Sequence, residues 1–172
     1  VGKDTLIRRL LALDPNLRYS VSCTTRPPRT GEVDGESYSF VSPERFRQLI
    51  EEGAFLEHAI YNGHHYGTLM DRVERVRDGG QDALLKIEVS GAEQVRRKEP
   101  AGLFIFVAPP SAGELARRQV ERNSESAQDM ASRRKIAEEE MTYASRYDHV
   151  VTNDDLARAV AEVARLIQDA RE

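Results

Sequence analysis

The sequence predicts an α/β fold, in which a core of parallel strands carries two insertions, one rich in β-structure and one helical. Helical and strand patterns alternate along most of the chain, which favours layers of helix packed on sheet. Residues 83–89 and 103–108 are short apolar runs, typical of parallel strands that are covered on both faces. Residues 20–76 and 112–142 interrupt the alternation, so we expect them to be the insertions.

The two ends of the chain both predict helices of the core. Residues 4–13 have the periodicity of a helix with one apolar face, and Pro15 ends it. The face consists of Leu6, Leu10 and Leu13. Residues 149–152 predict a strand that leads into a closing helix. The buried stripe of the closing helix is expected to be Leu156, Val160, Val163 and Ile167.

The two insertions differ in composition. Residues 30–40, TGEVDGESYSF, are rich in turn residues and predict a hairpin. A short helix should follow, with Ser42 as its N-cap, Pro43 at its first position and Gly53 beyond its end. The helical insertion has little apolar content, so it should pack weakly and move. Its basic residues are Arg117, Arg118, Arg122, Arg133, Arg134 and Lys135.

The composition is that of an ordinary globular protein of 172 residues, with 40% apolar and 31% charged residues, which favours a single domain. The formal net charge of −4 argues against a protein that coats nucleic acid or a membrane surface. Cys23 is the sole cysteine, so no internal disulfide can form. The sequence contains no run of 18 apolar residues and opens with no secretory signal, so we expect a cytoplasmic location.

The chain starts with VGKDTL, the pattern of the end of a phosphate-binding loop. Gly2 and Lys3 directly precede a helix, where backbone N–H groups and the lysine can hold phosphate. The first glycine of such a loop is absent, and Asp4 stands where a hydroxyl residue is usual. We therefore expect a strand and the beginning of the loop to precede Val1. The alternative is a Gly-Lys turn with Asp4 as the helix cap.

The stretch CTTRPPR, residues 23–29, places two arginines on either side of two prolines. Prolines cannot occupy a helix interior or a central strand, and they stiffen the chain. Arg26 and Arg29 should therefore hold their guanidinium groups at a fixed separation. This pattern predicts a clamp for an anion, and the alternative is a solvated surface loop.

Five stretches together resemble guanylate kinase, in order and over nearly the whole chain: SCTTRPPR, GEVDGESYSF, NGHHYGT, LFIFVAPPS and VVTNDD. The resemblance implies transfer of the γ-phosphoryl group of ATP to GMP or dGMP, with Mg²⁺ bound together with ATP. It also implies a three-layer P-loop core, a β-rich GMP-binding insertion and a helical lid, in one domain. The core would be 1–19, 77–111 and 143–172, the insertion 20–76 and the lid 112–142.

The resemblance also assigns roles to individual residues. Arg26 and Arg29 would grip the phosphate of GMP with the hydroxyls of Tyr38 and Tyr66, because arginine binds phosphate oxygens bidentately. Glu57 would accept the N–H donors of guanine. The GMP-binding residues would be Ser22, Arg26, Arg29, Tyr38, Glu57, Tyr66, Thr68 and Glu88; the ATP-binding residues Gly2, Lys3, Asp4, Thr5, Arg118, Arg122 and Asn153; and the catalytic residues Lys3, Arg26, Arg118, Arg122 and Arg133.

The attacking group would be an oxygen of the GMP phosphate, which is already ionised, so the reaction requires no nucleophilic side chain. Asn153 matches an adenine-contacting position, with a helix N-cap as the alternative. The spacing of the four histidines is not that of a zinc site, so no metal is expected on the protein itself. Magnesium should be carried by the nucleotide phosphates.

Lys86 stands where the resembled family often has an acidic residue, and it should lie near the phosphate loop. We therefore hypothesise an ion pair between Asp4 and Lys86; the alternative is that Asp4 caps the helix and Lys86 points elsewhere. Two other functions compete with the kinase: a catalytically inactive guanylate-kinase-like interaction module, and a related P-loop kinase with another acceptor. Lys3 and the lid arginines argue against the first, and Glu57 with Ser22 argues against the second.

Overall fold

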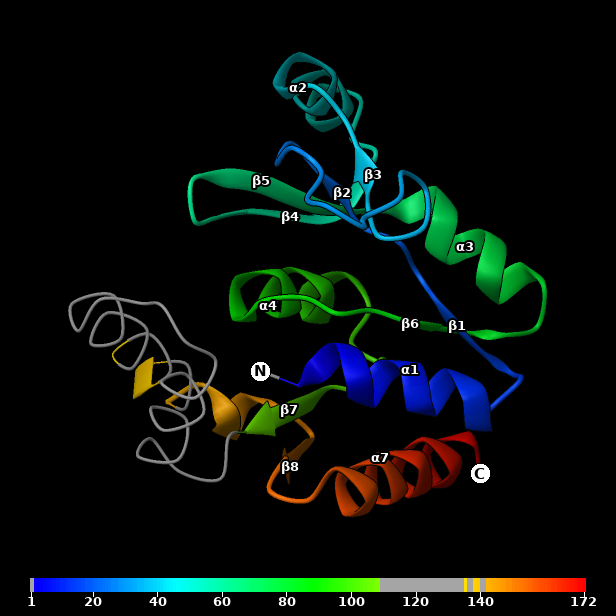
Figure 1. Ribbon diagram of the computed structural model, residues 1–172. Helices are drawn as coiled ribbons and strands as arrows, with labels where there is room; N and C mark the ends of the chain where they lie inside the picture. Colours follow the sequence, from blue (N-terminus) through cyan, green and yellow to red (C-terminus); the bar gives the residue numbers. More distant parts are fainter. Residues whose placement is uncertain (1, 109–134, 136–137, 140–141) are drawn as a thin grey trace. The chain divides into compact units, whose positions relative to one another are not determined.

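The computed structural model describes residues 2–108, 135, 138–139 and 142–172 (Figure 1). The chain divides into two compact units, Val1–Leu10 with Leu103–Glu172, and Leu11–Gly102. Helix α1 (Lys3–Leu13) passes from the first unit into the second. Each unit combines helices with a pair of parallel strands, so the predicted α/β class is confirmed. Among the described residues, no helix is long and apolar enough to cross a membrane.

The first unit contains the predicted C-terminal strand and helix. Strand β7 (Ile105–Ala108) pairs in parallel with β8 (His149–Thr152), with Ile105 opposite His149. A 3₁₀ turn, η1 (Ala144–Arg146), precedes β8, and α7 (Leu156–Arg171) follows it. The predicted stripe of α7 is correct for Val160, Val163 and Ile167, which are buried, whereas Leu156 is half-buried.

The second unit begins with a parallel pair, β1 (Leu17–Tyr19) and β6 (Asp82–Leu84). The predicted strand 83–89 is therefore too long. β1 offers only three residues for pairing, and β6 ends with them at Leu84. The next four residues are irregular, and helix α4 (Val89–Lys98) then begins.

A four-stranded sheet forms the rest of the second unit, in the order β3 (Ser39–Phe40), β2 (Cys23–Thr24), β5 (His64–Leu69) and β4 (Phe55–Tyr61). The hairpin predicted over 30–40 is wrong, because β3 pairs in parallel with β2. The hairpin of this region is β4–β5 instead. Its turn is Asn62–Gly63, and both residues have positive φ (51° and 79°), as two-residue hairpin turns require.

The core of this unit lies between the sheet and helix α2 (Pro43–Glu51). Phe46 is 1% exposed and stacks on Phe55 with ring centroids 4.6 Å apart. Cys23 and Leu49 complete the buried cluster. The predicted cap is confirmed, because the Ser42 hydroxyl accepts a hydrogen bond from the Arg45 N–H. Helix α3 (Met70–Asp78) continues directly from β5.

Candidate functional site

Three of the predicted site residues lie in one row across the four-stranded sheet. The ladder pairs Glu57 of β4 with Thr68 of β5, and Cys23 of β2 with Gly67. Ser22, one residue before Cys23, therefore lies opposite Thr68 in the antiparallel register. Residues directly opposite one another point to the same face of a sheet, so these three side chains belong to one surface. All three residues are buried.

Glu57 is the buried carboxylate of this row, at 5% exposure. The Thr68 hydroxyl donates to its Oε1 atom at 2.8 Å. Burial raises the pKa of Glu57, while the Thr68 hydrogen bond and the charge of Lys98 act in the opposite direction. Glu88, which precedes α4, also raises the pKa of Glu57 through its charge. A carboxylate in this position can accept hydrogen bonds from N–H donors of a ligand.

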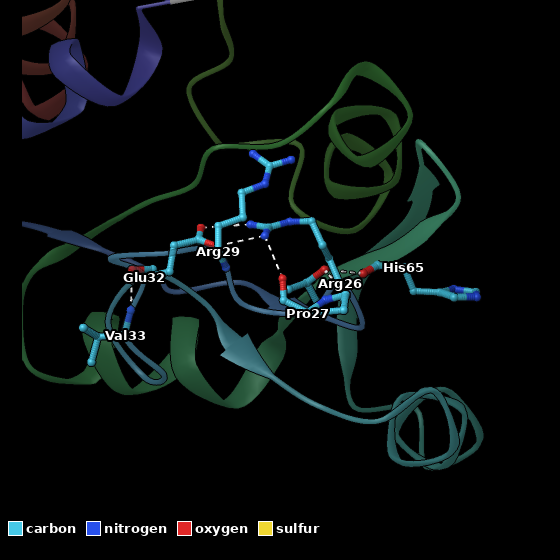
Figure 2. Close-up of polar contacts among 8 residues, drawn as sticks. Arg26, Pro27, Arg29, Glu32, Val33 and His65 are labelled. Atoms are coloured by element: carbon cyan, nitrogen blue, oxygen red, sulfur yellow. Dashed lines mark hydrogen bonds and ion pairs between the residues drawn. The ribbon is translucent and has the colours of Figure 1, made fainter.

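Arg26 is the most strongly held cation of the predicted clamp (Figure 2). Its Nη1 and Nη2 atoms donate to the two carboxylate oxygens of Glu32, each at 2.9 Å, and Nη1 also donates to the Pro27 carbonyl at 2.9 Å. These bonds use three of the five N–H donors of the guanidinium group. The Glu32 hydrogen bonds raise the pKa of Arg26, and the Tyr66 hydroxyl adds to the effect. The Tyr66 side chain is a further hydrogen-bond partner of the group.

Glu32 is a site residue that the sequence analysis missed. Its carboxylate accepts from Arg26 and also from the Arg29 backbone N–H at 2.7 Å. The hydrogen bond with Arg26, followed by the one with Arg29, lowers the pKa of Glu32 to about 2. The sequence signal for this ion pair is an acidic residue six positions after Arg26, beyond the two prolines.

The chain that leads into the clamp is tied to β5. Thr24 is fully buried, and its hydroxyl donates to the His65 carbonyl at 2.9 Å while accepting from the Arg26 N–H at 3.1 Å. The Thr25 hydroxyl accepts from the His65 N–H at 3.0 Å. The position of Arg26 is therefore fixed by both its backbone and its side chain. The prolines that follow are exposed.

The other three members of the predicted clamp differ in their surroundings. The Tyr38 and Tyr66 rings meet edge to face with centroids 5.9 Å apart, and the Arg26 guanidinium lies 5.2 Å from the Tyr38 centroid. The structure therefore brings Arg26 and both tyrosines together. Arg29 is exposed, and in Figure 2 its guanidinium points away from the pair formed by Arg26 and Glu32.

The predicted ATP-side residues that can be described lie in the first unit. Gly2 has φ of 82°, and a Cβ atom there would lie 2.8 Å from the Nδ2 atom of Asn153. Lys3 begins α1, and Asp4 and Thr5 occupy its first turn. Asp4 is therefore inside the helix and is not its N-cap residue. The structure brings Gly2 and Asn153 together at the start of α1.

The alternative role of Asn153, as the N-cap of the closing helix, is wrong. The N-cap of α7 is Asp155, whose carboxylate accepts from the Arg158 N–H at 2.9 Å. Asn153 is buried at 7% exposure, and its N–H donates to the Ala108 carbonyl at 2.8 Å. This position, just after β8, leaves its side chain beside Gly2.

Several predictions remain outside what the structure describes. The lid arginines Arg118, Arg122 and Arg133 lie outside the described residues. Asp4 and Lys86 belong to different units, so their ion pair stays a prediction. Lys86 follows β6, and its Nζ atom lies 6.0 Å from the centroid of the Tyr38 ring. In the described part of the chain, no group of three or more His, Cys, Asp or Glu residues could hold a metal ion.

The chain is similar to known proteins in both its sequence and its structure. The family model for guanylate kinase matches residues 1–170. The chain is 45% identical to a guanylate kinase of Caldanaerobacter subterraneus subsp. tengcongensis, over 96% of this chain and 81% of that one. It is 48% identical to a guanylate kinase of Symbiobacterium thermophilum, over 97% of this chain and 79% of that one. A crystal structure of guanylate kinase from Anaplasma phagocytophilum aligns with a TM-score of 0.81 at 32% identity, covering 96% of this chain and 80% of that one.

Proposed function

The chain belongs to the guanylate kinase family, and we propose from this that it transfers the γ-phosphoryl group of ATP to GMP or dGMP, forming GDP or dGDP and ADP. One observation gives the strongest support for GMP as the acceptor. The buried Glu57 carboxylate, which Thr68 holds at 2.8 Å, lies on the same sheet as the Arg26 clamp. A base with N–H donors and a phosphate monoester fit these two features together.

The guanine base is the part of the acceptor that Glu57 would read. Guanine presents an N1–H and a 2-amino group on its Watson–Crick edge, whereas adenine has an unprotonated N1. A carboxylate accepts both guanine donors and has no donor for adenine N1. Ser22 and Thr68 supply hydroxyl groups in the same row, and Glu88 lies at the start of the neighbouring helix. Burial strengthens the discrimination, because a mismatched base would leave Glu57 unpaired.

The phosphate of GMP would bind to Arg26, Arg29 and the hydroxyls of Tyr38 and Tyr66. Glu32 and the Pro27 carbonyl hold Arg26 through three donors, and this leaves the other edge of the group for phosphate oxygens. A cation that is already oriented loses less entropy on binding. One oxygen of that phosphate then attacks the γ-phosphorus of ATP, so orientation and charge neutralisation carry the catalysis.

On the ATP side, Gly2 and Lys3 would hold the phosphates at the start of α1, and Asn153 would contact the adenine. Magnesium, when bound with ATP, neutralises charge on the phosphate oxygens. Asp4 would pair with Lys86, and the nucleotide phosphates and water would supply the magnesium ligands. Arg118, Arg122 and Arg133 would neutralise charge on the transferring phosphoryl group.

The test is a comparison of acceptors. ADP release from Mg-ATP is measured with GMP, dGMP, AMP, CMP and UMP in turn. We expect GMP and dGMP to give turnover and AMP to be slower by orders of magnitude, because a site of buried hydrogen bonds rejects the wrong partner strongly. Equal turnover of AMP would favour a P-loop kinase with another acceptor. Binding of GMP without any turnover would favour an inactive interaction module.

A further inference from the structure

Strand β4, which carries Glu57, lies at the edge of its sheet, and within the described residues no strand pairs with its other side. Helix α4 packs along this side (Figure 1). An edge strand exposes backbone N–H and C=O groups that require other partners. Here side chains of α4 supply those partners, and they do so on both sides of Glu57.

Two side chains of α4 hold the two peptide groups that flank Glu57. The side-chain amide of Gln94 accepts from the His58 N–H at 3.1 Å and donates to the His58 carbonyl at 2.8 Å. The His58 N–H belongs to the peptide that follows Glu57. The Lys98 ammonium donates to the Leu56 carbonyl at 2.7 Å, and this carbonyl belongs to the peptide that precedes Glu57. Both backbone dihedrals of Glu57 are therefore restrained by α4.

A third residue of α4 determines where the Glu57 side chain can lie. Gly91 is buried in the first turn of the helix, and a Cβ atom added to it would lie 2.4 Å from Oε2 of Glu57. Real Cβ atoms do not approach an oxygen so closely, so an alanine at this position would displace the carboxylate. The backbone of Gly91 is not in the left-handed region, so no turn requires a glycine there. Glycine is otherwise a poor residue for a helix interior.

We propose that α4 positions the guanine-reading carboxylate: Gln94 fixes the backbone that carries Glu57, and Gly91 leaves the space that its carboxylate occupies. Both are positioning residues that act through Glu57. The inference rests on the proposed function, because it assigns them to recognition of the guanine base. It predicts that substitutions of Gln94 and Gly91 change the choice of base without changing the transfer step.

Gly91→Ala separates this role from a structural one. Alanine is the better helix former and fits the backbone, and the atom it meets is the end of a flexible side chain. Thermal stability should therefore be kept or raised while recognition of guanine is lost. The matched control is Gly79→Ala, since an added Cβ there meets carbonyl oxygens at ordinary distances of 3.4 and 3.5 Å. The control should leave both stability and base choice nearly unchanged.

Gln94→Ala tests the backbone restraint. Its matched control is Gln81→Ala, because the Gln81 amide also bridges to a backbone carbonyl, that of Pro15, at 2.9 Å. If Gln94→Ala does not fold, Gln94→Glu keeps an acceptor for the His58 N–H and loses only the donor. For each variant, KM and kcat are measured with GMP and with IMP, whose base keeps N1–H and lacks the 2-amino group.

We expect Gln94→Ala and Gly91→Ala to raise the KM for GMP by about fivefold to thirtyfold, with kcat changed by less than about twofold. The preference for GMP over IMP should fall by a similar factor, because the second donor loses its partner. If the wild-type protein uses GMP and both variants keep its KM and its preference for GMP over IMP, this inference is wrong and the proposed function stands. If the wild-type protein does not use GMP, the proposed function and this inference both fail. Equal losses with GMP and IMP, in step with lost thermal stability, would also overturn the inference.

Discussion

Replacing Glu57 with glutamine should separate recognition of guanine from folding stability, because the two respond in opposite directions. The change keeps the size of the side chain and an oxygen for the Thr68 hydroxyl, which donates at 2.8 Å. It removes the charge and places an NH₂ group where the second carboxylate oxygen was. A guanine donor would then face another donor.

The loss in recognition can be estimated from the hydrogen bonds. A hydrogen bond to a charged group is worth about 1.5–3 kcal/mol, and the substitution removes one and weakens the other. We expect a total of about 3–4 kcal/mol, which corresponds to a loss of about a hundredfold to a thousandfold in kcat/KM for GMP. The matched control is Glu93→Gln, which removes a carboxylate that pairs with Arg96 on α4. The control should leave kcat/KM for GMP nearly unchanged.

The folding stability of Glu57→Gln should be unchanged or higher, whereas its recognition of guanine is lost. Burial raises the pKa of Glu57 above its usual value of about 4.5, so the folded protein takes up this proton more readily than the unfolded chain does. The protonated Glu57 carboxyl therefore favours folding below pH 4.5. This contribution to stability is lost as the pH rises through the raised pKa of the folded protein. At neutral pH Glu57→Gln should unfold at the same or a higher urea concentration than the wild type. Binding of GMP to the wild type should weaken as the pH falls through the same range.

ADP-release kinetics and urea denaturation, each from pH 4.5 to 8, test both halves of this prediction. The reasoning is refuted if Glu57→Gln keeps its kcat/KM for GMP. It is also refuted if the variant is strongly destabilised at neutral pH, since the carboxylate would then serve the fold and not the ligand.

Three further sets of substitutions test the clamp, the ion pair and the core. Arg26→Ala or Arg29→Ala should lower kcat/KM for GMP by about tenfold to a hundredfold without weakening ATP binding. Arg29→Lys should keep only part of the wild-type kcat/KM, because the bidentate fork is lost. Unchanged GMP affinity in both alanine variants contradicts the clamp. Lys86→Ala should impair use of ATP more than the double change Asp4→Ser with Lys86→Asp; a double variant no better than the single one refutes the ion pair. Phe46→Ala should cost about 3–5 kcal/mol in urea denaturation, because the ring is fully buried against Phe55; a loss below 1 kcal/mol would show that this core is loosely packed.

Features set by neighbouring residues were predictable from the sequence. The Ser42 cap depends on residues within one turn of α2, and the apolar stripe of α7 repeats with the helical period. The turn of the β4–β5 hairpin was also readable, because Asn62-Gly63 between two strand-like runs is a strong hairpin signal. The turn residues of 30–40 predicted a hairpin there instead, but the strand at the end of this stretch, β3, pairs in parallel with β2.

Features that depend on distant residues were not predictable in the same way. The length of β6 is set by its partner β1, and the apolar run that continues beyond Leu84 gives no sign of this limit. Gln94 looks like an ordinary helix-surface residue until the fold brings it to His58, 36 positions away. The family resemblance supplied Glu57 and Arg26, but not the residues that hold them in place.

The central claim is that the phosphoryl group passes from ATP to GMP. Phosphorus NMR of the protein with Mg-ATP and GMP tests it most directly, because each phosphorus atom is observed separately. The account predicts that the γ-phosphorus signal of ATP decreases while the β-phosphorus signals of GDP and ADP increase in equal amounts. Release of inorganic phosphate in place of GDP, or no change over many hours at a concentration of protein comparable with that of the nucleotides, would contradict it.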